Sequence, residues 1–344
     1  MKKIISLFLT ILFICCLTSC DNSKLKKFTD YSFDYFDTVT TIVGFEESQG
    51  DFDNNCKKIK NWLSEYHKLY DIYTRYDNLN NLCTINSSTE PVKVDTRIID
   101  MLLYAKKMYK LTDGKINIAM GSVLSIWHDY REDGLNNPST AQLPPISALK
   151  EANKHTDFNN IVINRENSTV QLTDPKTSLD VGAIAKGYAT QEIAKLMKEQ
   201  NITGYILNVG GNVCIVGEKA DGEKWKVGIE NPDTENKDKP YIEYLSLSEM
   251  SLVTSGSYQR YYTVDGKNHH HIIDPVTLMP ADNFKSVSVL CQDSALADSL
   301  STALFCMSFE DGKKLVESIP NTHAMWVLKD GKQLYSKNFK KYCE

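Results

Sequence analysis

The segment DVGAIAKGY, residues 180–188, joins a short apolar strand to a helix that we expect over about 185–199. A glycine turn leads into this helix, whose first N–H groups have no intrahelical partners and can therefore bind an anion. Lys186 adds a positive charge near the same helix start. Turns of this kind are common, so the segment by itself is equally consistent with a purely structural role.

On both sides of this segment, the sequence alternates between helical and strand patterns. Apolar residues at helical spacing predict helices at 53–73, 95–112, 147–154, 185–199, 294–307 and 312–319. Short runs with alternating or β-branched residues predict strands at 35–45, 161–163, 169–172, 205–209, 213–216, 225–229, 244–247, 251–254, 261–264, 270–274, 286–291, 324–328 and 333–335. Residues 129–145 are polar and contain glycine and proline, which predicts a loop. Helices packed on hairpin-rich sheets indicate an α+β fold with mixed or antiparallel sheets.

The first twenty residues have the pattern of an export signal. A basic start at Lys2 and Lys3 precedes an apolar run at 4–17 and the sequence Leu-Thr-Ser-Cys ending at Cys20. This ending resembles a bacterial lipobox, which predicts a signal peptide over 1–19 and lipidation of Cys20. We expect a polar tether over 20–30, a domain over 31–344 and a location on the outer face of the cell membrane. A plain signal peptide or a signal anchor is the alternative.

Composition excludes some function classes. The chain has 42% hydrophobic and 24% charged residues and a net charge of −5, with no marked cluster of basic residues, so nucleic acid is not an expected partner. Six cysteines follow Cys20, without the C-x-x-C spacing of metal sites. We expect them to be buried free thiols, although an exported location permits a disulfide. They are Cys56, Cys83, Cys214, Cys291, Cys306 and Cys343.

Three further segments contain residues suited to chemistry. Gly210 and Gly211 follow a strand, which allows positive φ or close approach to a ligand, or simply a tight turn. The run of three histidines at 269–271 cannot all bind one ion, because neighbours in a strand point to opposite faces. We expect a single histidine to act as a base or hydrogen-bonding group, and His269 to lie on the surface.

Asp298 and Thr302 form the third of these features. They lie four residues apart in a predicted helix and so share one face. A carboxylate and a hydroxyl are hard oxygen ligands suited to Mg²⁺. A helix whose aspartate and threonine only contact a polar neighbour is the alternative, and the pair alone favours that reading.

Taken together and in order, these segments resemble the FAD:protein FMN transferase family, also called ApbE. The resemblance covers nearly all of the mature chain and implies an ApbE-like, T-fold-like flavin transferase fold. It rests on residues 179–188, 208–212, 254–258, 270–275 and 297–303, with a weaker likeness at 73–76 and 113–118. The chain departs from the family at Asn117, where many members have aspartate, and at Leu278, where a glycine usually follows the threonine.

The resemblance implies that the chain transfers FMN from FAD to a threonine hydroxyl of an acceptor protein and releases AMP, with Mg²⁺ as cofactor. It implies a Mg²⁺ site formed by Ala183, Asp298, Ser301 and Thr302. The FAD contacts that it implies are Phe36, Tyr76, Lys115, Ile116, Asn117, Asp180, Lys186 and Ile272. Family members modify subunits of membrane redox complexes, so an acceptor of that kind is expected.

Within this reaction we hypothesise that His271 takes the proton of the acceptor threonine and that Lys186 stabilises phosphoryl charge. Two alternatives remain open. The first is a Mg²⁺-dependent FAD pyrophosphatase, in which water replaces the threonine and the products are FMN and AMP. The second is a flavin-binding lipoprotein without catalysis, since exported lipoproteins are frequently binding modules.

Overall fold

The computed structural model describes residues 25–219 and 221–344, so the predicted signal peptide and Cys20 lie outside the described residues. The centre of the fold is an eight-stranded sheet in which every neighbouring pair is antiparallel. Its strands, in spatial order, are β1 (Lys26–Tyr35), β2 (Thr38–Glu46), β6 (Tyr205–Val209), β7 (Asn212–Val216), β10 (Ser251–Gly256), β13 (Ser286–Cys291), β14 (His323–Val327) and β15 (Gln333–Tyr335). The predicted α+β class with antiparallel sheets is confirmed.

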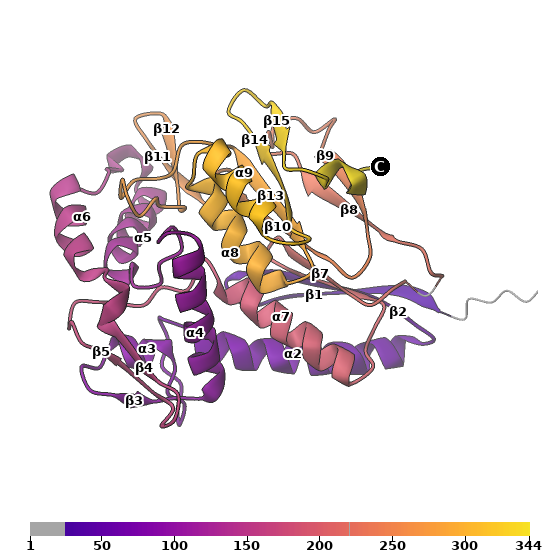
Figure 1. The fold of residues 1–344 in the computed structure, drawn as a ribbon, viewed down its shortest axis with the longest axis horizontal. Helices are drawn as coiled ribbons and strands as arrows, with labels where there is room; N and C mark the ends of the chain where they lie inside the picture. The colour runs from indigo at the N-terminus through magenta and orange to yellow at the C-terminus, as the bar shows by residue number, and fades with distance from the viewer. Residues whose placement is uncertain (1–24, 220) are drawn as a thin grey trace, which may run out of the picture.

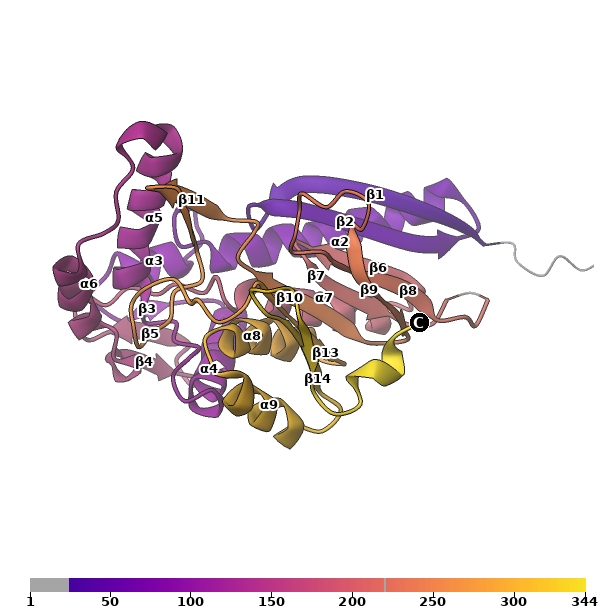
Figure 2. The same ribbon diagram turned by 90° about the horizontal axis from the view of Figure 1, so that it is seen from above.

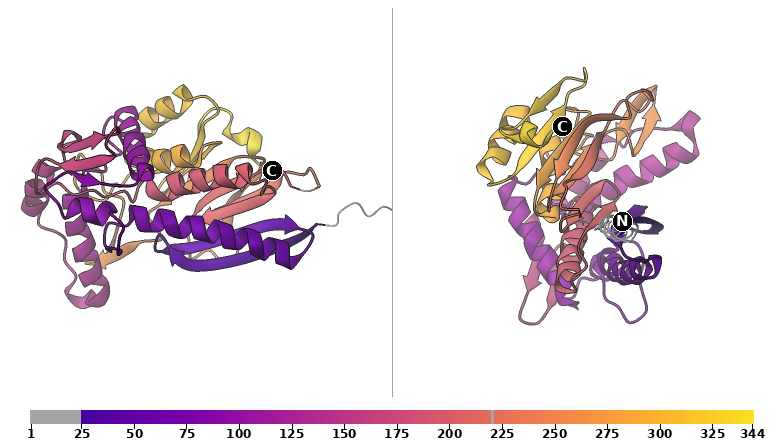
Figure 3. Two further views of the ribbon diagram at one scale, coloured as in Figure 1. Left: turned by 90° about the horizontal axis from the view of Figure 1, so that it is seen from below. Right: turned by 90° about the vertical axis from the view of Figure 1, so that its right-hand side faces the viewer.

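Helices cover one face of this sheet and a hairpin covers the other (Figures 1 and 3). The helices α2 (Gln49–Tyr70), α7 (Ala185–Glu199) and α8 (Ser294–Phe305) contact the sheet on one side, and α9 (Phe309–Ser318) packs beside α8. The hairpin of β8 (Trp225–Glu230) and β9 (Tyr241–Leu247) packs on the other side. Successive side chains of β10 point to opposite faces of the sheet. Val253 therefore packs in the core on the helix side and Leu252 in the core on the hairpin side.

A second group of elements lies beyond one end of the main sheet (Figures 1 and 2). Most of it is an insertion between α2 and α7, and the hairpin of β11 and β12 packs on its helix α5. The elements are α3 (Leu82–Asn86), β3 (Val92–Lys93), α4 (Thr96–Leu111), α5 (Gly121–Asn136), α6 (Ile146–Ala152), β4 (Ile161–Asn164), β5 (Thr169–Leu172), β11 (Tyr261–Val264) and β12 (Lys267–His270).

Several predicted boundaries differ from the structure, and the strand predicted at 270–274 is instead β12 at Lys267–His270. The strand β1 begins at Lys26, inside the predicted tether, because an edge strand needs little apolar alternation once it pairs with β2. Its partner starts at Thr38, after a turn in which Phe36 and Asp37 have positive φ of 54° and 49°. The helix α5 continues through 129–136, where a loop is predicted; its second half is stabilised by packing of Gly134 against Tyr262 rather than by its own pattern.

The prediction about the cysteines can be compared with the described residues. All six cysteines after Cys20 are free thiols, and all but Cys343 are buried, as predicted. Within residues 25–219 and 221–344, no helix combines the length and apolarity needed to cross a bilayer.

Candidate active site

A cavity of about 1110 Å³ opens where the main sheet meets the inserted elements. Its walls come from the β1–β2 turn, the segment before α5, the start of α7, the end of β10, the β11–β12 hairpin and α8. Eleven of the residues predicted to carry function line it: Phe36, Lys115, Ile116, Asn117, Asp180, Ala183, Lys186, His271, Ile272, Asp298 and Thr302. Segments far apart in the sequence therefore meet at one place.

The contact between α7 and α8 creates the most unusual group in this cavity. The backbone N–H of Gly187 donates to Oδ2 of Asp298 at 2.7 Å. The helices approach so closely that a Cβ on residue 187 would lie 2.3 Å from Asp298 Cβ and 2.6 Å from the Ser294 carbonyl oxygen. Glycine at 187 is thus required by packing. The predicted anion-binding helix start does hold an anion, but that anion is the carboxylate of Asp298.

Among the described residues, the Asp298 carboxylate has no cationic partner in contact. The residue is 4% exposed, and the Gly187 N–H is the only donor to its carboxylate in that part of the chain. Burial raises the pKa of Asp298, and Lys186 and the Gly187 N–H only partly oppose this effect. A buried carboxylate on a cavity wall with so little compensation is suited to a bound cation.

Neutral hydroxyl groups cluster on the same helix and on the end of β10. The Ser255 hydroxyl lies 2.8 Å from the Ser301 hydroxyl and 3.2 Å from the Thr302 hydroxyl, and Ser301 Oγ donates to the Asp298 carbonyl oxygen at 2.9 Å. Ala183 lines the same cavity, whereas Ser301 is fully buried behind it. No group of three or more His, Cys, Asp or Glu residues forms a metal site in the described part of the chain. The donor set therefore fits Mg²⁺, which accepts few carboxylates, and not zinc.

The segment before α7 is fixed by its own polar contacts. Asp180 Oδ1 accepts from the Gly182 N–H at 2.8 Å, and the Asp180 N–H donates to the Ile118 carbonyl at 2.8 Å. Burial raises the pKa of Asp180. The Lys186 ammonium reaches the Gly182 carbonyl at 3.3 Å, so a cation lies beside the turn. Beyond this turn, Gly210 and Gly211 line the cavity with positive φ, as their pairing predicted.

Two of the predicted FAD contacts have polar partners within the protein. Lys115 Nζ forms an ion pair with Asp274 Oδ1 at 2.9 Å, and both side chains are largely buried. The Asn117 amide donates to the Thr156 carbonyl at 2.9 Å, while its Oδ1 accepts from the Ala119 N–H at 3.0 Å. Asn117 therefore holds the chain that precedes α5, and it lines the cavity at the same time.

The three histidines have different surroundings. His269 is 8% exposed beside the Tyr262 ring, so its predicted place on the surface is wrong; the hairpin folds this face onto α5. His270 is also buried, with Nδ1 accepting from the Ile272 N–H and Nε2 bonded to the Ala281 carbonyl. The strand β12 ends at His270, so His271 lies outside it.

All three histidines line the cavity, and of the three only His271 is exposed. Its Nδ1 lies 3.3 Å from the Arg260 carbonyl oxygen, and its backbone N–H donates to the same oxygen at 3.1 Å. A carbonyl can only accept, so Nδ1 carries the proton and Nε2 is left with a lone pair. The enclosing walls and the Arg260 guanidinium lower the pKa of His271, which keeps the ring neutral at pH 7.

Tyr76 is a predicted FAD contact that the structure does not place in the cavity. Its hydroxyl donates to Asp71 Oδ2 at 2.8 Å, and Tyr73, three residues earlier, lines the cavity instead. The two tyrosines flank Thr74 and Arg75. The weak resemblance at 73–76 could therefore assign the FAD contact to either tyrosine. Sequence reasoning also missed His128, Arg131 and Arg260 as lining residues. Only Arg260 had a signal, since it lies two residues after the segment 254–258.

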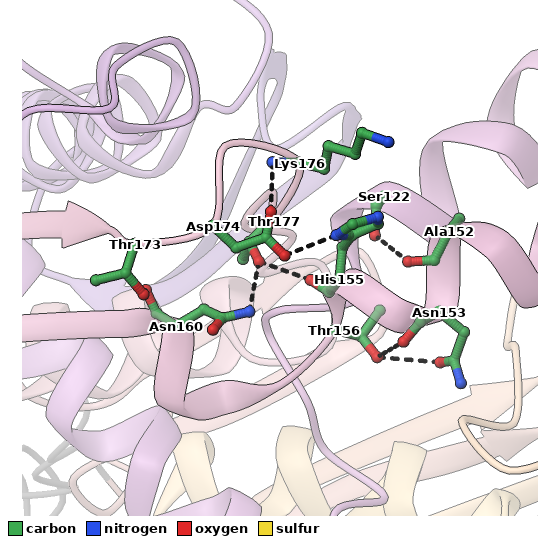
Figure 4. Close-up of polar contacts among 10 residues, drawn as sticks. All are labelled: Ser122, Ala152, Asn153, His155, Thr156, Asn160, Thr173, Asp174, Lys176 and Thr177. Carbon is green, nitrogen blue, oxygen red and sulfur yellow. Dashed lines mark hydrogen bonds and ion pairs between the residues drawn. The ribbon is translucent and has the colours of Figure 1, made fainter.

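A second group of polar contacts lies apart from this cavity, around a groove of about 340 Å³ (Figure 4). His155 Nδ1 contacts Asp174 Oδ2 at 2.6 Å, and the Thr177 hydroxyl donates to the His155 carbonyl at 2.7 Å. Ser122 Oγ donates to the Ala152 carbonyl rather than to His155. These bonds join α5, α6 and β5 to one another, which is a structural role.

Comparisons with known proteins agree with this geometry. A model of the ApbE family matches residues 36–326. The FAD:protein FMN transferase of Treponema pallidum is 33% identical over 258 residues, which cover 71% of this chain and 69% of the relative. That of Haemophilus influenzae is 25% identical over 336 residues, covering 95% and 93%.

Solved structures give the same result. The ApbE protein of Thermotoga maritima has 28% identity and a TM-score of 0.80, covering 93% of this chain and all of that one. A histidine-to-glycine variant of the flavin transferase ApbE from Vibrio cholerae has 25% identity and a TM-score of 0.75, covering 92% and 99%.

Proposed function

Because this chain belongs to the ApbE family, we infer that it is an FAD:protein FMN transferase, which moves FMN from FAD to an acceptor protein. We further propose that a threonine hydroxyl receives the FMN and that AMP leaves. The observation that carries this proposal is the α7–α8 contact, which holds the buried Asp298 carboxylate on the wall of a cavity large enough for a dinucleotide.

We propose that Mg²⁺ binds beside Asp298. The Asp298 carboxylate, the Thr302 hydroxyl and the backbone carbonyl groups of Ala183 and Ser301 would hold it. These are hard oxygen ligands, and the buried carboxylate has no cation in contact among the residues that the structure describes. When bound, such an ion neutralises charge that develops on phosphoryl oxygens.

FAD is the substrate that fits the rest of the cavity. Lys186 is placed to contact the diphosphate, since its ammonium lies by the turn that leads into α7. Asp180, Ile272, Phe36 and the 115–117 segment would contact the remainder of the molecule. Tyr73 takes the place assigned to Tyr76, since Tyr73 is on the cavity wall.

We propose that His271 Nε2 takes the proton from the acceptor hydroxyl. The hydroxyl oxygen forms a bond to the FMN-side phosphorus, the bond from that phosphorus to the bridging oxygen breaks, and AMP leaves with that oxygen. The hydrogen bond from Nδ1 to the Arg260 carbonyl supports this role, because it leaves the second nitrogen free to accept a proton.

Co-expression tests the proposed function. The chain is co-expressed with the threonine-bearing domain of a membrane redox-complex subunit, and covalent flavin on that domain is detected by in-gel fluorescence. We expect a fluorescent acceptor band with the unsubstituted chain and none after substitution of the acceptor threonine by alanine. Transfer by the purified chain with FAD should also require Mg²⁺, so EDTA should abolish it. Rapid release of FMN and AMP without an acceptor would instead indicate a pyrophosphatase.

We also propose that the protein is held on the outer side of the membrane by lipid on Cys20. The basic start, the apolar run and the Leu-Thr-Ser-Cys ending support this. A Cys20→Ala variant should leave the membrane fraction after cell fractionation; retention there would contradict the anchor.

A further inference from the structure

Three apolar side chains on the first hairpin are exposed to an unusual degree. Tyr31 and Phe33 on β1 are 61% and 74% exposed, and Val39 on β2 is 44% exposed. Tyr31 pairs with Thr41, and a bulge places Phe33 opposite the residues around Val39, so the three share one side of the hairpin. We call Tyr31, Phe33 and Val39 the hairpin face. Exposed apolar groups that cluster in this way commonly mark an interaction site.

The opposite side of the same hairpin is covered. The helix α2 lies along it (Figure 3, left), where Phe28 stacks on Phe52 with 5.5 Å between ring centroids and Lys60 pairs with Asp30 at 2.6 Å. Ser32, between the two exposed aromatics, is only 6% exposed. The hairpin thus buries one side in its own core and leaves the hairpin face without an intramolecular partner among the described residues.

Strand addition at the edge of β1 does not explain this exposure. The bulge between Ser32 and Tyr35 interrupts the edge, and the Tyr31 N–H is already bonded to the Asp30 carboxylate at 2.8 Å. Bulges and charges of this kind protect edge strands from pairing with another chain. A partner would therefore contact side chains of the hairpin face and not the strand edge.

The hairpin face is continuous with the active site. Val39 and Thr41 belong to the hairpin and also line the cavity, and so do Phe36 and Asp37 in its turn. The turn lies toward the β11 side of the molecule in Figure 2, where the Arg260 guanidinium donates to the Asp37 carbonyl at 3.0 Å. The carbonyl of the same arginine fixes His271. Arg260 therefore contacts both the turn of the hairpin and the proposed base.

The charges beside the hairpin face limit what can bind there. Asp34 and Asp37 lie next to the hairpin face and would repel an acidic segment. The fitting occupant is an extended, apolar and non-acidic polypeptide segment.

We propose that the hairpin face is the docking surface for the acceptor protein. An apolar stretch beside the acceptor threonine packs on Tyr31, Phe33 and Val39 and directs the threonine past Asp37 and Arg260 to His271. This proposal rests on the proposed transferase function, because only a protein substrate needs such a surface beside the cavity. Two of the three residues of this face, Tyr31 and Phe33, do not line the cavity, so they can be substituted without changing the FAD site.

Steady-state kinetics with the acceptor domain used above test the proposal, with Phe33→Ser as the main variant. We expect the KM for the acceptor to rise about tenfold, as for loss of a central aromatic at an interface, while kcat and the Kd for FAD stay unchanged. A Phe33→Leu variant should regain most of the affinity. Tyr241→Ser is the matched control, because it removes another exposed aromatic, 43% exposed on β9, and should not change the KM.

The outcomes separate the two proposals. If the unsubstituted chain transfers no flavin to any acceptor, the proposed function fails and the docking surface fails with it. If transfer is normal and Phe33→Ser leaves the acceptor KM unchanged, the docking surface alone is wrong. An unchanged KM together with weaker binding to phosphatidylglycerol vesicles would assign the hairpin face to the membrane. An unchanged KM together with loss of a dimer in sedimentation velocity would assign it to a second copy of the chain.

Discussion

At the scale of single residues, the site depends on one carboxylate that the protein does not neutralise. Asp298 is buried, accepts one backbone hydrogen bond from the described residues and has a raised pKa. Such a group lowers the stability of the protein without a ligand and raises its affinity for a cation. His271 has the opposite character, since its surroundings keep it uncharged and ready to accept a proton.

Asp298→Asn tests the first of these effects. The amide retains an oxygen for the Gly187 N–H but has no negative charge, so we expect Mg²⁺-dependent transfer to fall by roughly 10²-fold or more. Without Mg²⁺, the variant should unfold at the same temperature as the unsubstituted protein or a higher one, because a buried charge is gone. Differential scanning fluorimetry measures the unfolding temperature without Mg²⁺ and the shift that Mg²⁺ causes, and the transfer assay measures the rate. Full activity together with an intact Mg²⁺-induced shift would show that the ion does not bind here.

Arg260→Met tests whether the Arg260 charge lowers the pKa of His271. A neutral His271 is required, so the rate falls as the pH drops through its pKa. The Arg260 charge lowers that pKa, and its removal should therefore raise it and move the acid limb of the rate profile toward neutral pH. The hydrogen bond to His271 uses the backbone carbonyl and survives the substitution. His271→Asn should lose the acid limb together with most of the rate, and a variant with the full rate would exclude the base.

At the scale of elements, the close contact between α7 and α8 depends on residue 187 being a glycine. Gly187 lets the start of α7 approach α8 until its N–H reaches Asp298, so packing and the metal site depend on one contact. The α7 range of 185–199 agrees with the prediction, because its apolar positions recur at helical spacing. The contact with α8 joins residues 111 positions apart and could not be derived from either pattern.

Gly187→Ala should therefore damage stability and activity together. A methyl group would overlap backbone and side-chain atoms of α8, for which we expect a loss of roughly 1–3 kcal/mol in the free energy of unfolding by urea. Gly50→Ala in α2 is the control. Its added methyl group would meet only Ser48 Oγ at 3.7 Å, so stability should stay the same or rise slightly. Equal effects of the two substitutions would mean that the α7–α8 contact is not tight.

At the scale of the whole molecule, the cavity connects the two groups of elements. The main sheet and the helices packed on it supply Asp298 on α8, Ala183 before α7 and the hairpin turn, while the inserted segment supplies Lys115, Asn117 and His128. A ligand that contacts both groups should therefore stabilise the entire fold as one unit.

FAD should raise the unfolding free energy by about 2.7 kcal/mol at a free concentration of 100 times its Kd. The shift should appear in a single transition, measured by the intrinsic fluorescence of the tryptophans, among which Trp127 is on the inserted side and Trp326 in the main sheet. AMP serves as the comparison and should give a smaller shift, because it lacks the flavin half. Two separate transitions, of which only one responds to FAD, would contradict the idea that the cavity couples both groups.

The sequence by itself determined most of the elements and the members of the site, because strand alternation, helical spacing and glycine turns act over a few residues. It also led to most of the predicted site residues that line the cavity, but it wrongly expected Tyr76 there and His269 on the surface, and it missed Tyr73, His128 and Arg131. Tertiary structure alone decided which groups touch. The Gly187–Asp298 bond, the Arg260–His271 contact and the exposed hairpin face all depend on how segments far apart in the sequence pack together. A local sequence pattern carries no information on that packing.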